Sequence, residues 1–83
     1  MNNKYFLTFK NTHEAIKAEK TIECKGIYIE IMPTPTEVTK SCGICICIKE
    51  DDIKIILEMI DSNLIGIDSI YYKKDKEYKK LSN

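Results

Sequence analysis

The chain has 83 residues, of which 43% are hydrophobic and 31% charged, and its formal net charge at pH 7 is zero. A chain of this length buries only somewhat more than half of its unfolded surface, which suffices for one modest core and excludes a second domain. No uncharged run approaches the roughly 20 apolar residues of a membrane-spanning helix, so we expect no membrane segment.

The first two expected elements are a strand and a helix. Residues 4–10 are mostly aromatic, β-branched or aliphatic, which predicts a strand that ends at Asn11. Either Asn11 or Thr12 can cap a helix that continues until Gly26. The apolar residues of this segment recur at helical spacing, at Ala15, Ala18 and Ile22.

A second strand is predicted over residues 27–32, where isoleucines alternate with Tyr28, Glu30 and Met32. The segment Pro33-Thr34-Pro35 fixes two φ angles and removes two backbone donors, so the strand must end there. We expect a stiffened loop from this segment to about Ser41.

The second half repeats the pattern of strand and helix. Residues 43–49 alternate isoleucine with Cys45 and Cys47, which predicts a third strand. Asp51 or Asp52 can cap a second helix that ends at Gly66, and residues 67–72 alternate as a fourth strand. The apolar stripe expected on this second helix is Ile53, Ile56, Leu57, Ile60 and Leu64.

The element order β-α-β-β-α-β predicts an α+β, ferredoxin-like sandwich, with a four-stranded antiparallel sheet and both helices on one face. We assign residues 1–72 to this single domain. Residues 73–83 contain five lysines against Asp75 and Glu77, so they carry +3 and residues 1–72 carry −3. These last residues are expected to be a mobile, solvated tail.

The four cysteines raise the question of which thiol reacts. The N-terminus shows neither a secretory apolar core nor a cleavage site, so we expect a cytoplasmic protein with reduced thiols. The predicted topology brings the loop that ends at Cys42 to the start of the first helix, near Thr12 and His13. A helix N-terminus stabilises a thiolate, and an imidazole can take its proton, so Cys42 is the candidate nucleophile and His13 its candidate partner.

The sequence resembles the DUF3343 family, which is described as selenium/sulfur carrier protein-like. The resemblance rests on Thr12-His13-Glu14-Ala15, on Ala18-Glu19-Lys20, and above all on Ile31-Met32-Pro33-Thr34-Pro35 followed by Ser41-Cys42-Gly43. Cys45 and Cys47 lie outside the family pattern.

The resemblance implies that Cys42 carries a persulfide, or its selenium equivalent, from a donor such as a cysteine desulfurase to an acceptor protein. The supporting loop residues would be Thr12, Pro33, Thr34, Pro35, Ser41 and Gly43. Such a protein is a carrier and not an enzyme with turnover, and it needs no cofactor.

Three other interpretations remain open. Small ferredoxin-like domains often only bind a partner, so a non-catalytic interaction or regulatory module is the main alternative. A soft-metal chaperone that uses the four cysteines is disfavoured because Cys24 is expected at the far end of the sheet from Cys42. A redox pair of Cys42 and Cys45 is disfavoured because such a C-x-x-C motif normally begins a helix, whereas this one begins a strand. The chain contains no Arg, which argues against nucleic acid as a partner, and the open sheet face offers a surface for a homodimer.

Overall fold

The computed structural model describes residues 4–34 and 43–82, without the side chain of Ser82. In chain order the elements are β1 (Lys4–Thr8), α1 (Thr12–Cys24), β2 (Ile29–Pro33), β3 (Ile44–Lys49), a 3-10 turn (Glu50–Asp52), α2 (Ile53–Asp61), β4 (Ser69–Lys74) and β5 (Glu77–Ser82). The order expected for the first six helices and strands is therefore confirmed.

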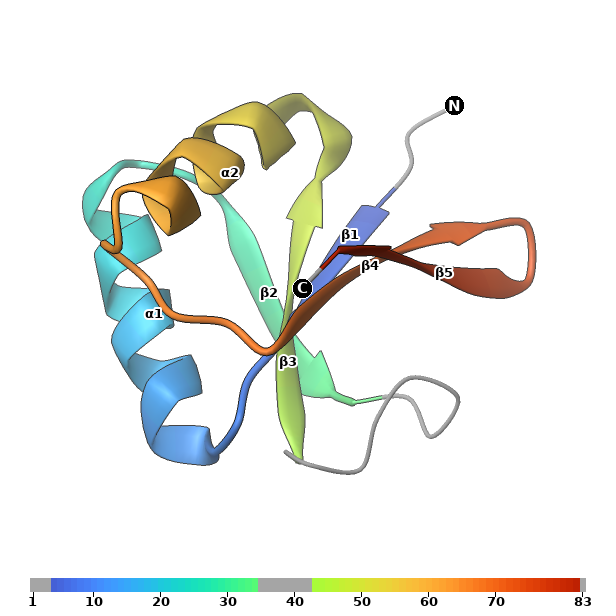
Figure 1. Cartoon of the computed structure of the whole chain (residues 1–83), viewed down its shortest axis with the longest axis horizontal. Helices are drawn as coiled ribbons and strands as arrows, with labels where there is room; N and C mark the ends of the chain where they lie inside the picture. The colour runs from blue at the N-terminus through green and yellow to red at the C-terminus, as the bar shows by residue number, and fades with distance from the viewer. Residues whose placement is uncertain (1–3, 35–42, 83) are drawn as a thin grey trace.

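The strands form one antiparallel sheet in the order β2-β3-β1-β4-β5. Both helices lie on the same side of this sheet (Figure 1). The fold is α+β, but the prediction of four strands was wrong because the sheet has five.

The fifth strand comes from residues that were expected to form a tail. β4 and β5 pair as a hairpin around Asp75 and Lys76, and Asp75 has a positive φ of 59° that closes the tight turn. Asp tolerates this left-handed conformation better than most residues do. The lysine-rich composition concealed the strand, because the side chains of an edge strand can remain in water while its backbone pairs.

The main core lies between the helices and the sheet. α1 begins as expected, because the side chain of Asn11 accepts a hydrogen bond of 2.9 Å from the backbone N–H of Glu14. It ends before Gly26, whose φ is +76°. The buried residues of this core are Leu7, Phe9, Ala15, Ala18, Ile22, Ile27, Ile46, Ile48, Ile56, Met59, Ile65 and Ile70.

The stripe predicted on the second helix is only partly buried. The helix ends at Asp61, well before Gly66, and Asn63 turns the chain with a φ of 63°. Leu57 lies inside the helix but is 41% exposed, and Leu64 lies beyond its end and is 51% exposed, whereas Met59 and Ile65 are buried. No side-chain bond of Asp52 caps this helix, since a 3-10 turn leads into it.

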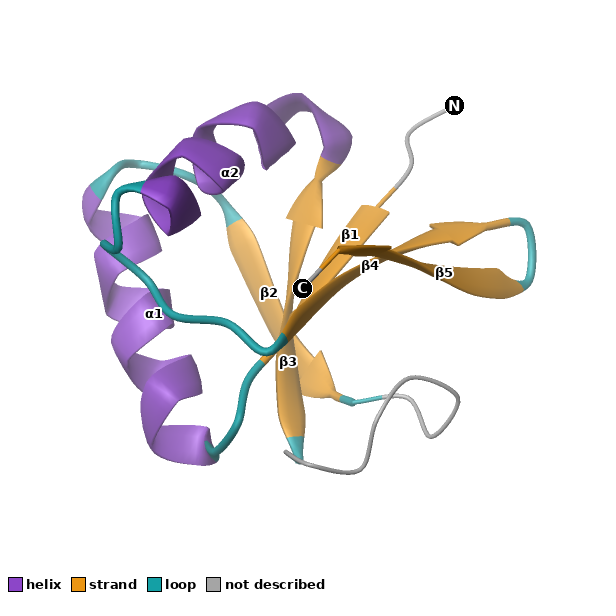
Figure 2. Ribbon diagram, viewed as in Figure 1, coloured by secondary structure: helices purple, strands orange, loops and turns teal. Residues whose placement is uncertain are grey.

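A second, smaller cluster lies on the sheet face that neither helix covers (Figure 2). Its buried members are Phe6, Cys45 and Cys47, and Met32, Tyr71 and Tyr78 pack against them. The ring of Tyr78 on β5 meets Phe6 edge-on with centroids 5.4 Å apart, although β4 separates their strands. The Tyr78 ring of the β4–β5 hairpin therefore reaches across β4 and helps to cover the buried residues of this cluster.

Candidate functional site

The candidate site lies at the end of the sheet where β1 ends and the chain enters α1. β2 ends and β3 begins at this same end (Figure 1). The backbone N–H of Thr34 donates to the carbonyl of Gly43 at 3.1 Å, so the chain leaves and re-enters the sheet at adjacent points. Of the predicted site residues, Pro35, Ser41 and Cys42 lie outside the described residues.

The two described ends of this loop differ in their surroundings. Pro33 is the last residue of β2, and its carbonyl oxygen accepts a weak, 4.0 Å hydrogen bond from the Cys45 thiol. The hydroxyl oxygen of Thr34 is buried and has no hydrogen-bond partner among the described residues. Gly43 is exposed, and a Cβ atom at this position would meet nothing within 4 Å. The start of β3 thus borders open space.

The first turn of α1 contributes backbone donors at the same end. Thr12 and His13 are the first two residues of the helix, and both are exposed. The first amides of an α-helix have no acceptor within the helix and lie at its positive end. This end of the protein can therefore attract an anion, whereas any contact between His13 and Cys42 involves a residue outside the described ones.

The three described cysteines are unequal in exposure. Cys24 is exposed at the end of α1, while Cys45 and Cys47 are 0% and 4% exposed on β3. Both belong to the cluster on the helix-free face, where they pack as small apolar residues. Both are closed to a large reactant in the folded protein.

Burial also sets the protonation state of Cys47. Loss of hydration raises the pKa of the Cys47 thiol, the nearby Lys4 ammonium lowers it, and the Glu30 carboxylate raises it further. The net result is a pKa above the ordinary thiol value. Cys47 therefore stays a protonated thiol near neutral pH, which is the unreactive form.

Two kinds of feature are absent from the described residues. Residues 4–34 and 43–82 contain no group of three or more His, Cys, Asp or Glu side chains that could hold a metal ion. Neither helix in this part of the chain is long and apolar enough to cross a membrane.

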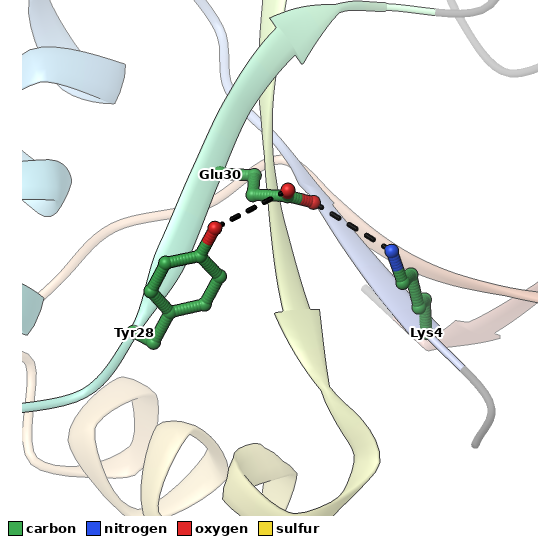
Figure 3. Close-up of polar contacts among 3 residues, drawn as sticks. All are labelled: Lys4, Tyr28 and Glu30. Carbon is green, nitrogen blue, oxygen red and sulfur yellow. Dashed lines mark hydrogen bonds and ion pairs between the residues drawn. The ribbon is translucent and has the colours of Figure 1, made fainter.

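Sequence reasoning missed a polar cluster at the opposite end of the sheet. Glu30 on β2 accepts a 3.3 Å hydrogen bond from the hydroxyl of Tyr28 and lies 3.6 Å from the ammonium of Lys4 (Figure 3). Tyr28 and Glu30 are two residues apart in the sequence, whereas Lys4 comes close to Glu30 only because β1 and β2 both pair with β3. A local sequence pattern cannot show which residues of two distant strands lie side by side.

Comparison with known proteins links the chain to sulfur and selenium carriers. A family model described as "Putative Se/S carrier protein-like" matches residues 4–72. A protein of Aquifex aeolicus (strain VF5) named "Putative sulfur carrier protein" is 30% identical over 79 residues, which are 93% of this chain and 40% of that protein. The chain therefore spans well under half the length of this relative. No solved structure matches this chain.

Proposed function

The chain belongs to the family described as "Putative Se/S carrier protein-like", and on this premise we propose that Cys42 carries a sulfur or selenium atom from a donor to an acceptor protein. The family predicted from the sequence is thereby confirmed. The chemistry on Cys42, the donor and the acceptor are our proposal.

We choose Cys42 because the two cysteines that follow it in the sequence, Cys45 and Cys47, are buried. Cys45 and Cys47 pack in the second cluster with at most 4% of their surface exposed, and burial keeps Cys47 protonated. A carrier must present its thiol to two different proteins, which needs an accessible atom. Gly43 borders open space, so the chain next to Cys42 offers no obstacle to a bulky partner.

In the proposed transfer, the terminal sulfur atom of a persulfide moves from the donor cysteine to the Cys42 thiolate. The Cys42 thiolate attacks the terminal sulfur of a persulfide on the donor, such as a cysteine desulfurase. A new S–S bond forms at Cys42, the donor's S–S bond breaks, and its electron pair leaves on the donor cysteine. The acceptor's nucleophile then attacks the terminal sulfur of Cys42 in the same way. No net oxidation occurs, and a selenium atom would follow the same steps.

Three groups near the loop support this chemistry. The positive end of α1 favours the Cys42 thiolate, and His13 is the proposed proton acceptor when the thiol ionises. The buried Thr34 hydroxyl, which has no partner among the described residues, is the proposed hydrogen-bond donor to the transferred atom.

We also interpret the first four strands, in the order β2-β3-β1-β4, as a ferredoxin-like core to which β5 has been added. In this interpretation the loop between β2 and β3 is the insertion that bears the reactive thiol.

The test is loading of the reduced protein by a cysteine desulfurase and cysteine, followed by intact-mass measurement. We expect the wild type to gain the mass of one sulfur atom, and Cys42→Ser to gain none. Cys24→Ser is the matched control, because the Cys24 thiol is exposed but lies at the far end of α1. Loading of Cys42→Ser at the wild-type level would contradict the proposal.

A further inference from the structure

The helix-free sheet face carries a row of three lysines. The register pairs Lys4 of β1 with Lys49 of β3 and with Lys73 of β4. Directly opposed residues of antiparallel strands point to the same face, and Lys4 is two positions from Phe6, which lies in the cluster on this face. All three side chains are exposed.

This row does not help the fold. Like charges directly opposite one another on neighbouring strands are destabilising, and here two such pairs meet at Lys4. A structural role would be met better by alternating signs. The arrangement therefore suits an anion that comes from outside the chain.

The contacts around the row neutralise it only in part. Lys4 lies 3.6 Å from Glu30, with 55% of its side chain still exposed. The Lys49 ammonium lies 5.3 Å from the centroid of the Tyr28 ring, and that of Lys73 lies 5.4 Å from the centroid of the Tyr78 ring. These rings orient the two ammonium groups but cancel no charge.

The face as a whole is positive. Lys80 of β5 is paired with Tyr71, so it joins the three lysines on this side, while Glu30 is the acidic residue that the described strands contribute here. Four lysines against one glutamate give this face a charge of +3. Because the chain as a whole is neutral, the remaining surface carries −3.

A small cavity lies beside the row. It has a volume of about 190 Å³ and is lined by Lys4, Tyr28, Glu30, Cys47, Ile48 and Lys49. Sites for drug-sized small molecules usually measure about 300 to 1,000 Å³. This cavity can accept a single side chain. Its wall carries two ammonium groups against the Glu30 carboxylate, and this net positive charge favours a carboxylate.

Nucleic acid and a second copy of the chain fit this face less well. A nucleobase needs an uncovered aromatic ring to stack on, but ammonium groups lie over Tyr28 and Tyr78, and Phe6 is buried. The chain also lacks the Arg side chains that bind phosphate in a bidentate manner. A twofold dimer through this face would bring +3 against +3.

We propose that the helix-free face docks an acidic segment of a partner protein, whose carboxylates contact Lys4, Lys49 and Lys73. Lys49 lies six positions from Gly43 along β3, which is about 20 Å at the rise of a strand. A partner held on this row therefore leaves the end of the sheet next to Cys42 uncovered. The docking surface does not depend on the proposed thiol chemistry.

The experiment measures binding of a fluorescein-labelled peptide of alternating glutamate and valine by fluorescence anisotropy. We expect saturable binding that weakens as salt is raised. The variant Lys4→Gln/Lys49→Gln/Lys73→Gln should bind about tenfold more weakly, because three partly exposed ion pairs are lost. The same peptide with glutamine in place of glutamate should not bind.

The matched control removes three lysines from the helices. Lys17→Gln/Lys20→Gln/Lys54→Gln changes the net charge equally at exposed positions of α1 and α2, and it should bind as the wild type does. Circular dichroism of both triple variants checks the fold, and we expect no loss in either. Cys42→Ser should also bind normally, so failure of sulfur loading and failure of docking are distinguishable.

Several results would overturn the proposal. If both triple variants bound the glutamate peptide equally weakly, the loss of binding would be due to net charge alone. Equal binding of the glutamine peptide would indicate an apolar surface. Tighter binding of a single-stranded oligouridylate would favour nucleic acid, and a dimer that the face variant dissociates in sedimentation would favour a second copy of the chain.

Discussion

Cys45 and Cys47 follow Cys42 closely in the sequence, yet the fold protects both of them. We predict that iodoacetamide at neutral pH modifies Cys24 at least about a hundredfold faster than Cys45 or Cys47, because the buried thiols react only when the sheet opens. Cys42 should react first of all. Fragmentation of the tryptic peptide 41–49 separates its three positions.

Unfolding in urea before labelling is the control for that measurement, and it should make the four thiols react at similar rates. Native labelling of Cys45 or Cys47 as fast as Cys24 would show that the second cluster is open in solution.

The raised pKa of Cys47 predicts a pH dependence of stability. Below about pH 8 the thiol is protonated in both the folded and the unfolded chain. As the pH rises, the unfolded chain loses this proton first, because burial raises the pKa only in the folded state. The free energy of unfolding should therefore fall above about pH 8.5, the pKa of an unperturbed thiol.

Urea titrations of the wild type and Cys47→Ala across pH 7 to about 10 test this sign. The variant should start less stable but lose less stability over the alkaline range. An equally steep loss in both proteins would assign the effect to other groups.

Part of this residue-scale account was predictable. The alternation of residues 43–49 correctly separates the isoleucines from Cys45 and Cys47. It could not show that the two thiols are buried, because the ring that helps to cover them, Tyr78, belongs to a strand missing from the prediction. Burial by a distant strand leaves no trace in the local pattern.

At the scale of elements, glycines at the end of α1 and the start of β3 have different tasks. Gly26 has a φ of +76°, which costs an L-residue about 1 kcal/mol, whereas Gly43 borders open space. We predict that Gly26→Ala lowers the free energy of unfolding by about 1 kcal/mol, and that Gly43→Ala changes it by less than about 0.5 kcal/mol.

Equilibrium unfolding in urea measures both variants, and equal effects would contradict the assignment. A bulkier change extends the comparison to function. Gly43→Val should fold but accept sulfur more slowly from a donor, because it narrows the approach next to Cys42.

The two helices show where sequence signals suffice at this scale. α1 combines a cap, an apolar spacing and a final glycine, so its bounds followed from local chemistry. α2 begins after a 3-10 turn and ends early at Asp61, before Asn63 turns the chain, and apolar residues continue beyond its end. A long apolar stripe therefore did not report the length of the helix.

At the scale of the whole molecule, β5 completes the side of the sheet that the helices leave open. Tyr78 packs on Phe6 and also lies beneath the Lys73 ammonium. We predict that Tyr78→Ala lowers the free energy of unfolding by about 2 kcal/mol, through lost burial and a lost aromatic pair. Tyr28→Ala is the matched control, since Tyr28 is 61% exposed, and it should cost less than about 0.5 kcal/mol.

Equal stability of the wild type and Tyr78→Ala would contradict the stabilising contact between the Tyr78 ring and Phe6. The fifth strand could not be predicted from its lysine-rich composition. Composition indicates that the side chains are in water, but it does not show whether the backbone pairs with another strand. Asp75 was a weak local signal, since Asp is one of the residues that turns favour.

The loop that bears Cys42 joins these scales, because its two ends are fixed by β2 and β3 while its proposed chemistry needs α1. The most direct test is the position of the transferred atom in the wild-type protein. After loading by a desulfurase and blocking of free thiols, the tryptic peptide 41–49 is fragmented in a mass spectrometer. We predict the additional sulfur at Cys42, with Cys45 and Cys47 unmodified. Sulfur found chiefly at Cys45 or Cys47 in this peptide, or at Cys24 in the tryptic peptide 21–25, would contradict this prediction.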